Sequence, residues 1–307
     1  MEKLKSSTLV KSLAKKAINP IHVGRAARLQ RHRKQLVRNQ CDPQLKLYAQ
    51  LMPNGFLHYG YFDDPTMCPR DMSLNSIANA QSKYAELVLD LVGDMESEIL
   101  DVGCGMGGLV RLMLERHLKP VALSPDKHQI STINALYPQT PTIQAKFEDI
   151  DEQEHRGRYG TVINAESLNY LHLEDALPRV EQILKPGGRW VICDFFRMDE
   201  DGCTSGHWEH FQKSVEDAGF YFSYQRDITP HILPTLAYVH MWGEEIGLPV
   251  IDFSIEKMRG KQPGLHYLLK EALGTLLDHA RNHLQIINPS DFQTRKRYML
   301  LVAERRA

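Results

Sequence analysis

The residues with the clearest chemical meaning lie in a glycine-rich segment that follows a short apolar run. Residues 99–108 read Ile-Leu-Asp-Val-Gly-Cys-Gly-Met-Gly-Gly. Glycines at the carboxyl end of a strand let the backbone turn sharply and approach a ligand, at the edge where open α/β sheets bind ligands. Gly103, Gly105 and Gly108 also satisfy the dinucleotide pattern G-x-G-x-x-G, which is weak alone. The segment therefore predicts a small-molecule site at the bend after Val102.

Two features argue against a dinucleotide at this bend. A dehydrogenase needs a carboxylate for the ribose about 20 residues later, whereas the next apolar run ends Ala122-Leu123-Ser124. The glycine segment also starts near residue 103, whereas a nicotinamide-binding domain more often opens its chain. Among the enzyme classes considered, a nicotinamide dehydrogenase therefore fits the segment least well.

A second polar group follows the predicted strand at 161–164. Residues 164–170 read Asn-Ala-Glu-Ser-Leu-Asn-Tyr. Glu166 is the candidate general base or anchor of a cationic centre, because opposite charge and desolvation shift a carboxyl pKa in opposing directions. A helix cap or a loop hydrogen bond is its alternative role. His207 is a second candidate base; it shares a helical face with His210, no third ligand stands nearby, and we expect no metal.

The elements that would position these residues alternate between strand and helix from residue 98 onward. Strands are predicted at 98–102, 121–123, 142–145, 161–164, 190–195, 220–224 and 298–302. Repeated βαβ units with short connections imply a parallel sheet covered by helices on both faces. We predict an α/β fold with a Rossmann-like, seven-stranded, mostly parallel sheet.

Helical patterns flank this core on both sides. Residues 3–18 predict an amphipathic helix ended by Pro20, 54–65 predict a loop, and 77–91 predict a helix. After Pro263, apolar residues keep helical spacing through 265–280 and predict a wide buried stripe. The predicted organisation is a basic helical arm and lid (1–70), a ligand-binding core (71–228), a helical substrate cap inserted before the last strand (229–295), and that strand (296–307).

Charge and cysteine content restrict the functional classes. The 307 residues carry a formal net charge of −1, yet the first forty hold eleven Lys or Arg and a single acid, Glu2. Such a basic arm favours docking on the acidic remainder of the protein, on a phosphorylated ligand or on a lipid surface.

Five scattered cysteines without a Cys-x-x-Cys pair indicate a reducing compartment. We expect a cytoplasmic protein, with a mitochondrial presequence as the alternative, and no nucleic-acid partner.

The glycine segment resembles a loop of class I methyltransferases, in which an acid-x-Gly-x-Gly-x-Gly pattern holds the amino-acid end of S-adenosyl-L-methionine. Asp101, Gly103, Gly105 and Gly107 occupy those places. The resemblance covers roughly residues 54–195 and, more loosely, the final strand. It implies S-adenosyl-L-methionine as the co-substrate.

Four further segments narrow the resemblance to the branch of cyclopropane-fatty-acid synthases, sterol and tocopherol C-methyltransferases and small-molecule N-methyltransferases. They are residues 58–62, 121–126, 147–148 and the turn 185–188. In this branch an aromatic-acid pair lies along the adenine, and an upstream segment closes over the donor. For some of the residues expected to contact the cofactor, a purely structural role is the alternative. The expected cofactor contacts are Tyr59, Tyr61, Asp101, Gly103, Gly105, Gly107, Ser124, Phe147, Glu148 and Asn164.

The resemblance implies methyl transfer to carbon or nitrogen of a small, largely apolar acceptor of isoprenoid, lipid or natural-product type. The sterol and tocopherol types carry Glu-His where this chain has Asn169-Tyr170, so their substrate does not transfer directly. Two alternatives remain: N-methylation of a hydrophobic amine, and a non-catalytic protein that binds the methyl donor. We expect a monomer or homodimer, with weak membrane-surface contact of the basic arm as one alternative to a lid.

Overall fold

A computed structural model describes residue 16 and residues 19–31, 54–199 and 206–306 of the chain. The chain divides into two compact units, one of residues 43–238 and 289–307, the other of residues 1–42 and 239–288. The expected helix at 3–18 lies outside the described residues, apart from residue 16. Pro20, expected to end that helix, instead stands at the first position of α2 (Pro20–Arg31), where its missing N–H costs nothing.

The larger unit is built on one seven-stranded sheet with the order β3-β2-β1-β4-β5-β7-β6. The first five strands pair in parallel, and β7 pairs antiparallel with both β5 and β6. The predicted seven-stranded, mostly parallel fold is therefore confirmed. The strands are β1 (Glu98–Val102), β2 (Lys119–Leu123), β3 (Thr142–Ile143), β4 (Tyr159–Ala165), β5 (Leu184–Arg197), β6 (Phe220–Asp227) and β7 (Lys296–Arg305).

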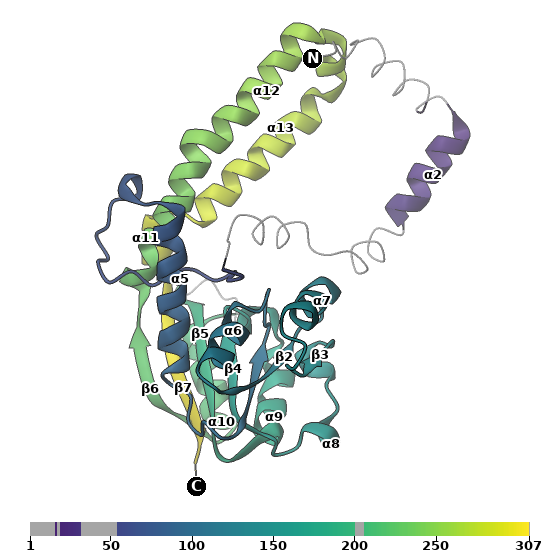
Figure 1. Cartoon of the computed structure of the whole chain (residues 1–307). Helices are drawn as coiled ribbons and strands as arrows, with labels where there is room; N and C mark the ends of the chain where they lie inside the picture. Colours follow the sequence, from purple (N-terminus) through teal and green to yellow (C-terminus); the bar gives the residue numbers. More distant parts are fainter. Residues whose placement is uncertain (1–15, 17–18, 32–53, 200–205, 307) are drawn as a thin grey trace. The chain divides into compact units, whose positions relative to one another are not determined.

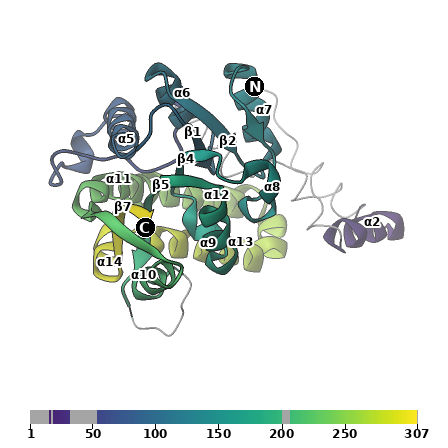
Figure 2. The same cartoon turned by 90° about the horizontal axis from the view of Figure 1, so that it is seen from below.

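Helices cover both faces of this sheet (Figures 1 and 2). One face carries α5 (Leu74–Leu89), α6 (Gly108–Glu115) and α7 (Lys127–Leu136), and the other carries α9 (Leu173–Ile183) and α10 (Trp208–Asp217). Short helices complete the unit: α8 (Glu152–His155), α14 (Pro289–Arg295) and the 3-10 turns η1 (Pro69–Asp71), η2 (Phe147–Asp149) and η3 (Leu168–Tyr170).

The core on the α9–α10 face explains why the strands are continuously apolar. Trp190, Ile192 and Phe196 of β5 are buried with Phe211 and Val215 of α10 in one cluster. A strand covered on both faces alternates little between apolar and polar residues, so β1, β4 and β5 read as apolar runs. This packing fixes the carboxyl ends of β1, β4 and β5, where the candidate residues lie.

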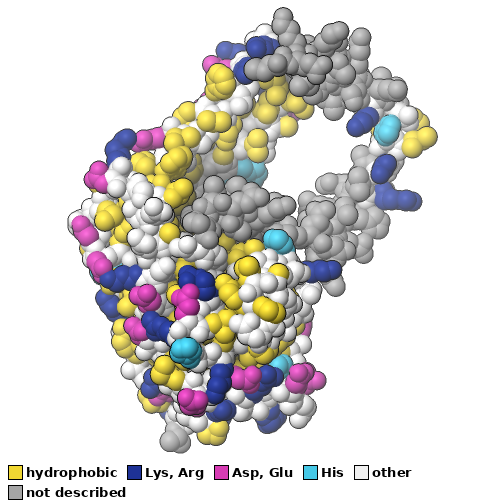
Figure 3. Space-filling view, viewed as in Figure 1, with side chains coloured by type: hydrophobic (Ala, Val, Ile, Leu, Met, Phe, Trp, Pro, Cys, Tyr) yellow, Lys and Arg dark blue, Asp and Glu magenta, His cyan; other side chains and the backbone are white. Residues whose placement is uncertain are grey.

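The second unit contains a pair of long helices, α12 (Leu248–Lys261) and α13 (Pro263–Ile286), preceded by the π-turn η4 (Gly243–Gly247). Helix α11 (Thr229–Trp242) belongs to the larger unit as far as Tyr238. The prediction of a wide buried stripe at 265–280 is wrong, because α13 packs against α12 and only Leu265 is buried. Leu268 is 72% exposed, and apolar side chains are visible along this pair (Figure 3).

Among the described helices, none combines the length and the apolar character that a membrane span requires.

Candidate functional site

The glycine loop after β1 adopts the conformation that its sequence predicts. Gly103, Gly105 and Gly107 all have positive φ angles, of 80°, 54° and 88°. This left-handed region is costly for residues with a Cβ, so glycine is required for the bend. Gly107 is the N-cap of α6, and the backbone N–H groups of Gly103 and Cys104 both donate to the carbonyl of Leu123. The bend is thus tied to the neighbouring strand end.

Gly103 also brings the bend against the turn that follows β4. A Cβ built on Gly103 would lie 2.6 Å from Cβ of Ser167, which is closer than real side chains approach. Ser167 is the neighbour of Glu166 in the chain. Two segments that the sequence separates by more than sixty residues therefore form one site at the carboxyl edge of the sheet.

Asp101 supplies an unsatisfied acceptor beneath the bend. Its side chain is 2% exposed, and Oδ2 has no hydrogen-bond partner. Burial raises the pKa of Asp101 to about 7. A buried carboxyl oxygen without a donor is costly, so it marks a place where a ligand N–H group would fit. An ammonium group, such as the one at the amino-acid end of S-adenosyl-L-methionine, matches this requirement in both charge and donor count.

The segment upstream of α5 packs against the glycine loop. The Phe56 ring occupies the space beside Gly108, and the position of a Cβ on Gly105 lies 3.4 Å from a methyl carbon of Leu57. His58 stacks on Tyr84 with ring centroids 4.1 Å apart. Burial lowers the pKa of His58 to about 4, so its ring is neutral, and its Nε2 has no partner. Gln81 Oε1 is a further buried acceptor without a donor, and sequence reasoning missed both atoms.

The two tyrosines of this segment lie in different environments. Tyr59 donates its backbone N–H to Oε1 of Glu166 at 2.7 Å, so it joins the upstream loop to the turn after β4. Tyr61 is 5% exposed, accepts from Arg226 at 2.7 Å through its hydroxyl, and stacks on His231. These contacts fix Tyr61 against β6 and α11, and they give it a packing role.

Glu166 is the most constrained residue of the site. It has a φ angle of 54°, which a non-glycine residue adopts only where the surroundings enforce it. Its Oε1 accepts from the Tyr298 hydroxyl at 2.5 Å as well as from the Tyr59 N–H. Burial raises the pKa of Glu166 to about 8, although both hydrogen bonds act to lower it. The carboxyl group is therefore held near its titration point at neutral pH.

Two tyrosines that the sequence did not point to complete this network. The Tyr84 hydroxyl donates to the carbonyl of Cys193 and lies 3.0 Å from the Tyr298 hydroxyl, which donates to Glu166. Both rings are buried, and burial raises both pKa values well above the usual range, so the hydroxyls stay protonated. The one signal in the sequence is that both tyrosines lie within apolar patterns, which predicts burial. A buried tyrosine hydroxyl needs a hydrogen-bond partner, so each could have been expected to join a polar network.

Four predicted cofactor residues make internal contacts. Ser124 donates to Gln129, and Phe147 is buried in the core. Glu148 accepts from the backbone of His172 at 3.2 Å. Asn164 donates to Ser167 at 2.8 Å and accepts from the Trp190 indole at the same distance. Asn164 is fully buried, so it braces the turn that carries Glu166.

His207 lies at the N-cap of α10, and its backbone bridges to Arg197 at the end of β5. Its side chain makes no capping hydrogen bond. The structure does not bring it into the Glu166 network, so its role as a base remains a prediction. In the described part of the chain, no group of three His, Cys, Asp or Glu side chains is arranged to hold a metal.

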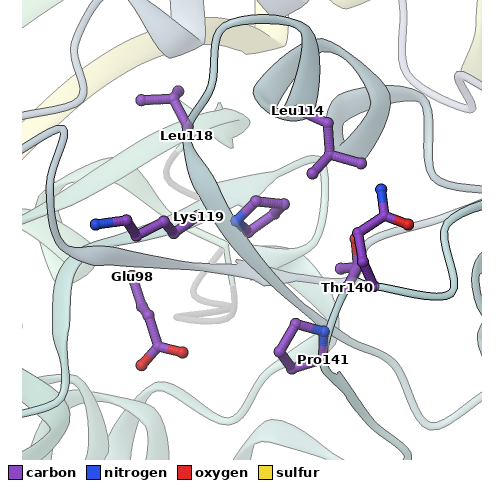
Figure 4. A pocket seen from close by; sticks show the side chains of 8 residues that line it. Glu98, Leu114, Leu118, Lys119, Thr140 and Pro141 are labelled. Carbon is purple, nitrogen blue, oxygen red and sulfur yellow. The ribbon is translucent and has the colours of Figure 1, made fainter.

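A shallow cavity of about 310 Å³ lies elsewhere, beside Glu98, Leu118, Lys119 and Thr140 (Figure 4). Glu98 and Lys119 are the first residues of β1 and β2, so this cavity is at the amino ends of the strands. The glycine loop and Glu166 lie at the carboxyl ends. The cavity is therefore separate from the candidate site.

Comparisons with known proteins agree with this geometry. Residues 99–188 match a family described as a methyltransferase domain. An uncharacterized methyltransferase of Mycobacterium tuberculosis is 28% identical over 131 residues, covering 40% of this chain and 53% of the relative. An O-methyltransferase of Aspergillus nomiae is 28% identical over 173 residues, covering 53% of this chain and 72% of that protein. The chain thus spans about half the length of the mycobacterial relative.

Among solved structures, the geranyl diphosphate C-methyltransferase from Streptomyces coelicolor A3(2) superimposes with a TM-score of 0.60 and 17% identity. The match covers 89% of this chain and 96% of that one. That structure holds Mg²⁺, geranyl-S-thiolodiphosphate and S-adenosyl-L-homocysteine. At this identity the likeness concerns the fold, which agrees with the sheet order found here.

Proposed function

We propose that this chain, which carries the core of a class I S-adenosylmethionine-dependent methyltransferase, transfers a methyl group to carbon or nitrogen of a small, largely apolar acceptor. The observation that carries the proposal is the meeting of the glycine loop with Glu166. Gly103 packs on Ser167, so the donor loop and the one strained carboxyl group share an edge of the sheet. The mechanism needs both a donor and a proton acceptor at that place.

The chain's own residues have separable roles in this mechanism. Asp101 and the backbone of the glycine loop would hold the amino-acid end of S-adenosyl-L-methionine, which supplies an activated methyl group on a sulfonium. Phe56 and Leu57 pack against the loop and Tyr59 joins the same segment to Glu166, so this segment would exclude water from the donor. Methyl transfer needs in-line placement of donor and acceptor more than it needs activation of the donor. Most of the protein's contribution is therefore positioning.

Glu166 takes the proton that the acceptor loses as its new bond to the methyl carbon forms and the sulfur–methyl bond of the donor breaks, which leaves S-adenosyl-L-homocysteine. A carboxyl group with a pKa of about 8 is a stronger base than an exposed glutamate once it is ionised. A positive charge beside it favours the ionised form and offsets the effect of burial. Tyr298 and the Tyr59 N–H hold Oε1, so the other oxygen, Oε2, is the one that faces the acceptor.

Carbon and nitrogen acceptors remain distinguishable by the product. The structural neighbour acts on geranyl diphosphate, which supports an isoprenoid type of acceptor. A hydrophobic amine is the second candidate, because the Glu166 carboxylate would pair with an ammonium group. Product analysis after incubation with a methyl-labelled donor separates a new C–methyl bond from an N–methyl bond.

The direct test combines binding with turnover. Calorimetry should detect S-adenosyl-L-homocysteine binding to the full chain, and Gly105→Val should abolish it because the loop could not adopt its positive φ. Absence of binding to the parent protein contradicts the proposal. Binding without turnover of isoprenoid, lipid and amine acceptors would favour a non-catalytic donor-binding protein.

A further inference from the structure

Lys296, at the start of β7, is a half-buried cation that makes no ion pair within the described part of the chain. Its Nζ lies 4.6 Å from the ring centroid of Phe195 and 5.3 Å from that of Phe292. These aromatic faces hold the ammonium group in place, but they do not neutralise it. Burial and the nearby Arg197 guanidinium lower the pKa of Lys296, and the Asp199 carboxylate offsets only part of this effect, so the charge of Lys296 is unfavourable where it lies.

A second cation stands directly opposite in the sheet. Lys296 pairs in register with Arg197, and directly opposed residues on neighbouring strands lie on the same face. Arg197 is held by Asp199, to whose Oδ1 it donates twice, at 3.2 and 3.1 Å. Arg295, the last residue of α14 and the neighbour of Lys296 in the chain, adds an exposed positive charge. Within this group three cations face one described carboxylate.

The sheet places this group beside the candidate catalytic residue. Lys296 and Tyr298 are two residues apart on β7, so their side chains lie on the same face, about 7 Å apart along the strand. Tyr298 is the residue that donates to Glu166. Phe195 pairs in register with Tyr298 and its ring contacts Lys296, so it offers an aromatic surface beside both residues to an apolar chain.

We propose that Lys296, supported by Arg197, anchors a phosphate or diphosphate group of the acceptor at the end of β5, so that the acceptor's apolar chain runs over Phe195 toward Glu166. Lysine and arginine are the usual ligands of phosphoryl oxygens. An anion there would also relieve the repulsion between the two cations. The inference deepens the proposed function by giving the acceptor a charged head group.

The test uses the full chain saturated with S-adenosyl-L-homocysteine, with inorganic pyrophosphate as the calorimetric probe. We expect pyrophosphate binding that Lys296→Gln weakens about ten-fold or more, the loss of one charge-assisted contact. Lys213→Gln removes an exposed lysine of α10 and serves as the matched control that leaves binding unchanged. Lys296→Arg should retain binding to within a few-fold, because the charge is kept.

Two further arms make the result decisive. Geranyl diphosphate should bind more tightly than geraniol to the parent protein, and Lys296→Gln should remove most of that difference. Equal losses in Lys296→Gln and Lys213→Gln, or no loss in either, overturn the inference. Unchanged S-adenosyl-L-homocysteine binding in every variant keeps this outcome distinct from failure of the methyltransferase proposal, which absence of that binding would indicate.

Discussion

Replacing Tyr298 with Phe removes one atom, the hydroxyl that donates to Glu166 at 2.5 Å, and leaves the ring in place. A hydrogen bond to a charged group contributes about 1.5–3 kcal/mol. Each 1.36 kcal/mol corresponds to one pKa unit. Because this hydrogen bond favours the ionised carboxylate, its loss should raise the pKa of Glu166 from about 8 by roughly 1–2 units.

The consequence for activity follows from the proton balance. Glu166 accepts a proton only in its ionised form, so kcat/KM should rise with pH through the pKa of the free enzyme. In Tyr298→Phe the rising limb moves to higher pH. Below that limb the rate falls about ten-fold for each unit of the shift, while the high-pH plateau stays near that of the parent.

The pKa can be measured without knowing the acceptor. Carbon-13 NMR of protein labelled at the glutamate carboxyl carbons reports the titration directly, and Glu166→Gln assigns the signal. Tyr221→Phe is the matched control, since the Tyr221 hydroxyl of β6 donates to partly buried Glu304 of β7. An unchanged or lower pKa of Glu166 in Tyr298→Phe would refute the assignment of Tyr298 as the residue that positions and ionises this carboxyl group.

Three other predictions follow from the same site. Glu166→Gln should lower turnover about 100-fold or more, the size of a general-base contribution, with S-adenosyl-L-homocysteine affinity unchanged by calorimetry. Gly103→Ala puts a Cβ 2.6 Å from that of Ser167 at a φ of 80°, so the melting temperature should fall by several degrees and donor binding should weaken. The ligand-free protein should lose stability as pH rises from 6.5 to 8: the pKa values of Asp101 and Glu166, about 7 and 8, are raised by burial, so the folded state binds protons that unfolding releases. Thermal melts of Asp101→Asn should show a weaker pH dependence, and a parent stability that increases across this range would contradict the burial of both carboxyl groups.

The seven strands along the chain and the glycine loop could be predicted from sequence because their signals are local. Residues 99–108 contain both the apolar strand and the glycines that its bend requires. The predicted position of Glu166 directly after β4 is also correct, since a polar residue that follows a buried strand must lie at the sheet edge. Its left-handed conformation carried no sequence signal, because this conformation is common only for glycine.

Contacts between distant segments could not be predicted in the same way. Tyr84 and Tyr298 are 214 residues apart and meet only because β7 pairs antiparallel with β5 beneath α5. Asn164, predicted as a cofactor contact, also hydrogen-bonds to Ser167 and Trp190, and no sign of these two contacts is present in the sequence. Helical spacing in 265–280 was read correctly as a helix, but periodicity reports which residues share a face and says nothing of whether another element covers it.

The buried acids of the site impose a common requirement on whatever binds there. Asp101 and Glu166 lie at the carboxyl ends of neighbouring strands, and burial raises the pKa of both. Removing an acidic group from water favours its neutral form unless a cation approaches. A methyl donor brings two cations, an ammonium and a sulfonium, to the edge of the sheet where both carboxyl groups lie. Ligand binding should therefore ionise both groups and stabilise the fold together, because a ligand that binds only the folded state adds its binding free energy to stability.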